Sequence, residues 1–229
     1  MKSESAPIFV VSAAPAEVFE NDGESELESS LKLPKIQLCR ANSLSALHEM
    51  QKEKAAVSSV VARLSPAARQ QLKSSFVVLD KTPLASGLSV MLRLLQNWPQ
   101  YKGLWPQFQS VADSQLLVSR ELRRHAAIFM CGIRRIIDTL DDEPRLVELL
   151  EKMALAHGAK GVKNFHLEHM LPFVVETLRQ SSIEENVELS EETTAAWSQL
   201  FGVVAELVDL LGRRQRRLST TRNLTAGPF

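Results

Sequence analysis

The stretch LVELLEKMALAHGAKGV, residues 146–162, decides how the rest of the chain is interpreted. Its apolar residues recur at intervals of three and four, which is the period of a helix with one buried face. His157 falls on this apolar face, and Gly158 follows it directly. A glycine can adopt the left-handed conformation that ends a helix. We therefore expect the helix to end near His157 and to turn this imidazole toward the core.

A second histidine lies on the apolar face of the preceding predicted helix. In LRRHAAIFM, residues 122–130, the side chains of Leu122, His125 and Phe129 share one helical stripe. The two histidines are 157 − 125 = 32 residues apart, and an acidic corner at residues 141–143 separates their helices. One inward histidine is usually a satisfied core residue, whereas two on consecutive helices indicate a shared site.

The sequence predicts an all-α domain. Ser65 with Pro66, and Thr82 with Pro83, have the pattern of an N-cap followed by proline at the first helical position. No alternating strand pattern competes with the helical one. We expect helices that begin at residues 65 and 82, a short helix from 99 to 104, and helices over 119–139, 144–157, 163–180 and 190–216.

Four stretches together resemble the globin family. They are TPLASG with VMLRLLQNWP (82–99), LRRHAAIFM (122–130), ALAHGAKGV (154–162) and EETTAAWSQLFGVV (191–204). The resemblance covers residues 65–217 and is greatest to neuroglobin-like and nematode globins. It implies a globin fold, with helices A to H in a 3-over-3 sandwich, and extended N- and C-terminal tails. It also places Gly87 where two globin helices cross closely.

The resemblance implies haem b as the cofactor. His157 would be the proximal iron ligand through one ring nitrogen, while the other donates to a backbone carbonyl near Met153 or Ala154. His125 could hydrogen-bond a gas ligand or ligate the iron itself. The resemblance to neuroglobin favours ligation, which gives a six-coordinate iron.

The expected haem pocket departs from the family pattern on the distal side. Trp105 stands where a phenylalanine normally packs on the haem, with Phe108 as a possible substitute, and Phe129 replaces a small valine. Both changes predict a crowded site. The same three aromatic residues could also be ordinary core packing. The remaining expected cofactor contacts are Met91, Met153 and Val162.

The other candidate sites are weaker. His166 and His169 are three residues apart, but no Cys or Asp cluster accompanies them, so we expect one satisfied and one solvated histidine rather than a metal site. Cys39 and Cys131 do not make a disulfide framework and fit a reducing compartment.

Composition limits the location and the partners. The net charge is zero, so no long-range field indicates nucleic acid. We expect no membrane span, no signal peptide and a cytoplasmic location. Residues 1–42 are predicted to be a disordered acidic extension, and 218–229 a flexible tail. Residues 43–64 are either a helical extension or a nascent helix that frays.

Three functions follow from these expectations. The first is a redox or gas-sensing globin that binds O2, CO or NO and acts on an unknown electron-transfer or signalling partner. The second is a reversible oxygen binder or transporter. The third is a haem-free helical interaction module, which the fold alone would permit. The sequence neither favours nor opposes a haem enzyme activity such as nitrite reduction or superoxide oxidation.

Overall fold

A computed structural model describes the backbone of residues 44–225 and the side chains of residues 48–213. Every regular element in this part of the chain is a helix, so the all-α prediction is confirmed. The α-helices are α2 (Leu44–Val61), α3 (Pro66–Asp80), α4 (Pro83–Asn97), α5 (Arg120–Thr139), α6 (Glu143–Ala159), α7 (Asn164–Glu184) and α8 (Glu191–Thr225). Two short 3-10 helices, η1 (Pro99–Leu104) and η2 (Asp113–Val118), lie between α4 and α5.

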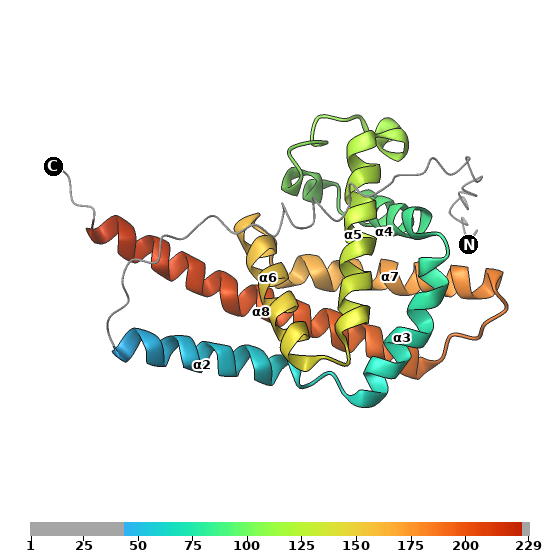
Figure 1. Cartoon of the computed structure of the whole chain (residues 1–229). Coiled ribbons are helices and arrows are strands. Elements are labelled where there is room, and N and C mark those ends of the chain that lie inside the picture. Colours follow the sequence, from blue (N-terminus) through green and yellow to red (C-terminus); the bar gives the residue numbers. More distant parts are fainter. Residues whose placement is uncertain (1–43, 226–229) are drawn as a thin grey trace, which may run out of the picture.

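Six helices form two packed layers (Figure 1). One layer contains α3, α5 and α6, and the other contains α4, α7 and α8. Between the layers, α5 packs on α4, α6 packs on α8, and α3 packs on both α7 and α8. The core includes the fully buried Trp197, whose indole Nε1 donates a hydrogen bond to Ser75 Oγ at 3.0 Å. This arrangement is the predicted 3-over-3 sandwich.

Side chains cap the helices that position the site. Ser65 Oγ accepts from the amide of Ala68, as its sequence pattern predicts. Ser119 caps α5 in the same way, and Asp142 caps α6. Thr82 occupies the N-cap of α4 and Pro83 its first turn, as predicted, but the Thr82 side chain makes no capping hydrogen bond.

The end of α6 differs from the prediction. Gly158 stays within the helix, which continues to Ala159, and Gly161 is the glycine with positive φ, at 81°. The amide of Val162 then donates to the carbonyl of His157 at 3.1 Å, which closes the helix around a left-handed residue. His157 lies in the last turn of α6, as expected, two residues before the helix ends.

The C-terminal boundary was also predicted too early. Helix α8 runs past Arg217 to Thr225, so the expected flexible tail is helical in its first part. The rest of that tail, residues 226–229, and the whole of the expected N-terminal extension, residues 1–42, lie outside the described residues.

Gly87 lies at a close helix crossing. A Cβ at this position would lie 2.6 Å from the carbonyl oxygen of Ala126 and 2.9 Å from Cγ of Met130. Only a residue without a side chain lets α4 approach α5 this closely. The predicted role of Gly87 is confirmed, and the contact fixes α5 immediately beside His125.

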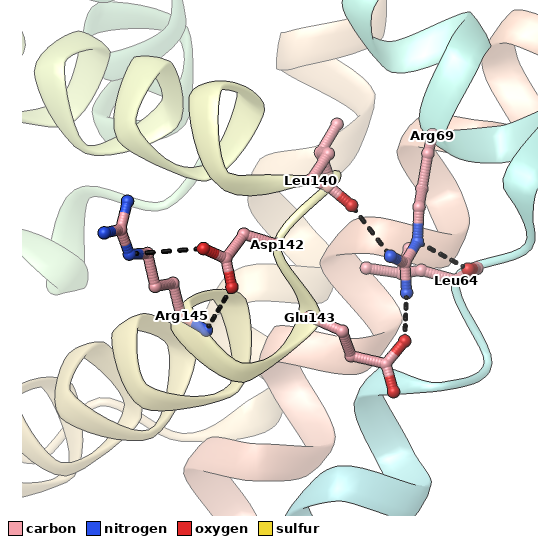
Figure 2. Close-up of polar contacts among 6 residues, drawn as sticks. All are labelled: Leu64, Arg69, Leu140, Asp142, Glu143 and Arg145. Atoms are coloured by element: carbon pink, nitrogen blue, oxygen red, sulfur yellow. Dashed lines mark hydrogen bonds and ion pairs between the residues drawn. The ribbon is translucent and has the colours of Figure 1, made fainter.

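Arg69 holds the corner between the two histidine-bearing helices (Figure 2). From α3, its guanidinium donates to the carbonyls of Leu64 and Leu140, at 3.0 and 2.7 Å, and pairs with Glu143 at 3.0 Å. Leu64 and Leu140 are fully buried. Arg69 therefore satisfies two carbonyls of buried residues and ties the end of α5 to the start of α6.

Helix α2, which precedes the six-helix core, packs against that core. The last turns of α2 bury Val57, Val60 and Val61, and α2 lies beside α6 and α8 (Figure 1). Within the described residues, α8 is long and apolar enough over Glu191–Arg213 to cross a membrane, but 61% of its apolar window is buried inside the protein. That burial is characteristic of a core helix.

Candidate functional site

His157 is oriented by its own helix. Its Nδ1 donates a hydrogen bond to the carbonyl oxygen of Met153, one turn earlier in α6, at 2.7 Å. This is the predicted bond to a backbone carbonyl. With its proton on Nδ1, the neutral ring carries its lone pair on Nε2. The helix thus presents a nitrogen that can act as an acceptor or a metal ligand.

His125 is oriented by a side chain from another element. The indole Nε1 of Trp105, directly after η1, donates a hydrogen bond to His125 Nε2 at 2.9 Å. An indole N–H is a donor only, so His125 Nε2 is the acceptor and its ring proton lies on Nδ1. The nitrogen on which His125 could ligate a metal is engaged by Trp105.

Both imidazoles are kept neutral by their surroundings. Burial, with the nearby His157 and Lys160, lowers the pKa of His125 to about 4. Burial also lowers the pKa of His157, although its bond to the Met153 carbonyl acts in the opposite direction. His157 is close enough to act electrostatically on His125, so the two helices bring the predicted pair of histidines together.

Aromatic rings surround His125. Trp105 stacks on Phe108, with ring centroids 5.5 Å apart and ring planes at 19°. The Trp105 and His125 rings meet edge to face, with centroids 5.1 Å apart and planes at 66°. The Phe108 ring lies 6.4 Å from that of His125, and the Phe108 side chain is fully buried. The structure therefore groups three of the predicted site residues, Trp105, Phe108 and His125, into one cluster.

The other predicted residues lie around the same core. Met91 is fully buried on α4, and Phe129 is partly buried one turn after His125 on α5. Met153 and Val162 are partly buried beside His157, and each is linked to it through the backbone. Their contacts with a cofactor stay predictions.

The donor set fits the haem that the globin resemblance implies. Haem needs a strong axial ligand in an apolar surround, and neutral imidazole is such a ligand. His157 supplies an oriented Nε2, and partly buried apolar side chains flank both histidines. Both imidazoles keep accessible surface while burial depresses their pKa values.

His169 forms a cluster with Trp98 and Tyr101 that the sequence did not indicate. The hydroxyl of Tyr101 and Nδ1 of His169 are hydrogen-bonded at 2.5 Å, and His169 stacks on Trp98 at 3.9 Å. His166 accepts from the amide of Lys163 at 2.8 Å. Both histidines are partly buried and hydrogen-bonded, so the expectation of one solvated histidine is wrong.

This second cluster borders a cavity of about 510 Å³ that Phe165 also lines. Tyr101 and His169 are 68 residues apart, so no local pattern could have paired them. Within the described residues, no group of three or more His, Cys, Asp or Glu side chains is placed to hold a metal ion.

Comparison with known proteins agrees with this geometry. The family model described as Globin matches residues 88–208. A globin from Nerita albicilla is 24% identical over 155 residues, which is 68% of this chain and 97% of that protein. Cytoglobin-1 of Oryzias latipes is 24% identical, over 52% of this chain and 67% of that protein.

Solved structures share the fold. A hexa-coordinate hemoglobin of Drosophila melanogaster superposes with a TM-score of 0.56 at 20% identity, covering 63% of this chain and 92% of that one. A double mutant of myoglobin from Aplysia limacina gives 0.57 at 17% identity, covering 63% and 95%. At these identities the likeness concerns the fold alone. The expected closer likeness to neuroglobin-like or nematode globins stays a prediction.

Proposed function

This chain belongs to the globin family, and from that premise we propose that it binds haem b through His157 and acts in redox signalling or gas sensing. Globins bind haem and diatomic gases, so the coarse function follows from the family. The finer proposal concerns which residues hold the cofactor and what the protein does with it.

The observation that carries the proposal is the hydrogen bond from His157 Nδ1 to the carbonyl of Met153. It fixes the ring orientation and tautomer, and it increases the basicity of Nε2, as partners behind a metal-bound histidine do. The lowered pKa keeps the ring neutral at neutral pH, the form that can ligate iron. His157 is therefore the proposed proximal ligand.

His125 is the proposed sixth ligand, from the opposite helix. Its neutral ring has the proton on Nδ1 and the lone pair on Nε2, which is the tautomer that ligation requires. When bound, haem supplies an iron that changes between ferric and ferrous states and binds diatomic gases. Reversible binding of His125 would couple either event to a movement of α5, which a signalling or electron-transfer partner can detect.

Apolar side chains perform the remaining task of the site. Met91, Phe108 and Phe129 carry no hydroxyl or charge, so they exclude water and offer a gas ligand no hydrogen bond of their own. Their bulk restricts the proposed gas ligands to small molecules such as O2, CO and NO. A cytoplasmic location remains part of the proposal.

One observation supports the second candidate, reversible oxygen binding. Because Trp105 already engages His125 Nε2, the protein has an alternative partner for this histidine when a gas occupies the sixth position. The discriminating measurement is the rate at which the ferrous protein turns ferric in air. A lifetime of hours would favour the oxygen binder, and a lifetime of seconds would favour the redox or sensing role.

Titration of the full-length apoprotein with haemin tests the proposal. We expect one equivalent to bind with a sharp Soret band, and His157→Leu to lose that band or to release the haem rapidly. His48→Leu is the matched control, since His48 is exposed on α2. If His157→Leu bound haem like the wild type, another residue would be the ligand. If the wild type bound no haem, only the haem-free interaction module would remain.

A further inference from the structure

We propose that Trp105 is a positioning residue that competes with the haem iron for His125, and so sets the balance between five- and six-coordinate iron. This inference rests on the proposed function, because it takes His125 as the sixth ligand. It deepens that function by naming the group that regulates the site.

The competition follows from one lone pair. A neutral imidazole has a single lone pair in the ring plane, and in His125 it lies on Nε2. The Trp105 N–H occupies it at 2.9 Å. The same electrons cannot accept a hydrogen bond and bind iron at the same time. His125 must leave Trp105 before it ligates, and Trp105 receives it again when the iron releases it.

The hydrogen bond also prepares His125 for ligation. A neutral histidine can carry its proton on either nitrogen. Donation by Trp105 selects the form with the proton on Nδ1, which is the form whose Nε2 binds iron. Trp105 therefore holds the histidine in the correct tautomer while it blocks the bond. Phenylalanine, the usual family residue at this position, could do neither.

Residues outside α5 and α6, the helices that carry the two histidines, hold the Trp105 indole in place. Trp105 follows η1, and its backbone amide donates to the carbonyl of Lys102 at 3.1 Å. Lys102 in turn bonds the carbonyl of Val111 and pairs with Asp113 at 2.8 Å. Stacking on the buried Phe108 fixes the ring itself. The contacts that position Trp105 are therefore independent of both histidines.

The first test is the optical spectrum of the ferrous haem-loaded protein without gas. Trp105→Phe keeps an aromatic ring but lacks the N–H. Loss of one neutral hydrogen bond should raise the ratio of six- to five-coordinate iron by about three- to tenfold. The rate of CO binding after rapid mixing should fall by a similar factor, since His125 must dissociate first.

Trp98→Phe is the matched control. It makes the same chemical change in the neighbouring aromatic cluster, where Trp98 stacks on His169 rather than on His125. It should leave both readouts at the wild-type value. Equal shifts in the two variants, or no shift in Trp105→Phe, would overturn the inference even if both proteins bind haem normally.

The second test needs no haem, and its decisive readout comes from the wild-type protein. Long-range proton–nitrogen NMR spectra of the apoprotein report which ring nitrogen of His125 carries the proton. We expect Nδ1 in the wild type and a mixture of tautomers in Trp105→Phe. A wild-type proton on Nε2 would overturn the inference. Failure of haem binding alone would instead overturn the proposed function, so the two failures are distinguishable.

Discussion

The two sides of the site hold their histidines by different means. On the proximal side, His157 donates to the backbone carbonyl of Met153, which any residue at position 153 would supply. On the distal side, His125 accepts from the side chain of Trp105, which one substitution can remove. The proximal histidine is thus fixed by the helix itself, whereas the distal histidine depends on a residue in an irregular segment. A substitution at position 105 can therefore change the hydrogen bond of His125 while that of His157 stays the same.

The largest expected effect concerns the corner that joins the two sides. Arg69→Met keeps the apolar stem but leaves the carbonyls of Leu64 and Leu140 without their donor. We expect a loss of about 3 kcal/mol in the free energy of unfolding, measured in urea. Arg145→Met is the control: the Arg145 side chain is 77% exposed, so its pair with Asp142 should contribute close to nothing. Similar losses of stability for both variants would show that the hydrogen bonds of Arg69 to the Leu64 and Leu140 carbonyls are not the cause.

The apoprotein should become less stable as the pH falls, because the folded protein keeps His125 neutral. The pKa of His125 is lowered from 6.5 to about 4 in the folded protein, so the unfolded chain binds a proton first as the pH falls. The stabilisation is complete above pH 6.5 and is lost as the pH falls toward the folded pKa. Between about pH 7.5 and about pH 5 we expect a loss of about 2 kcal/mol from this group.

His125→Leu is the variant that checks this origin. Urea unfolding at both pH values should show a shallower pH dependence than the wild type. The lowered pKa of His157 contributes in the same direction, so part of the dependence should remain. An unchanged slope in His125→Leu would mean that desolvation does not keep His125 neutral in the folded protein.

A smaller effect on stability is expected at Gly87, where α4 crosses α5 next to His125. Gly87→Ala places a methyl group against the carbonyl of Ala126, next to His125 on α5, and should destabilise the protein by about 1 kcal/mol. Gly202→Ala is the opposite case, since nothing lies within 4 Å of its Cβ. It should stabilise α8 by about 0.5 kcal/mol. The same sign for both substitutions would contradict the close crossing.

The smallest effect should come from Met153, although it is the hydrogen-bond partner of His157. Met153→Leu retains the carbonyl and nearly the same side-chain volume, so its effect on stability should lie well below the limit of about 1.5 kcal/mol for volume-conserving substitutions. The rate of haem loss to an apoglobin scavenger should stay at the wild-type value. A marked acceleration would show that the side chain, and not the backbone, holds the proximal histidine.

Much of the fold was predictable because local patterns specify it. The helical period placed His125 and His157 on inward faces, Ser65 with Pro66 marked the start of α3, and Gly87 marked the crossing. The end of α6 was not predictable in the same way. Gly158 and Gly161 lie three residues apart, and both can take a positive φ, so only the hydrogen bonds of the finished turn select Gly161.

The details of the site required contacts between distant segments. The hydrogen bond from Trp105 to His125 joins an irregular segment to a helix, and no periodicity describes such a segment. The same is true of Tyr101 and His169, which tertiary packing alone brings together. The sequence thus indicated which residues face the core, but not which of them bond to one another.

The most direct test of the two-histidine site is the visible spectrum of the ferrous protein without gas, for the wild type and His125→Leu. We predict sharp, split bands of six-coordinate iron in the wild type, in a proportion set by Trp105. His125→Leu should show only the broad band of five-coordinate iron while it retains haem. Identical spectra for the two proteins would contradict the account, because His125 would then have no part in binding the iron.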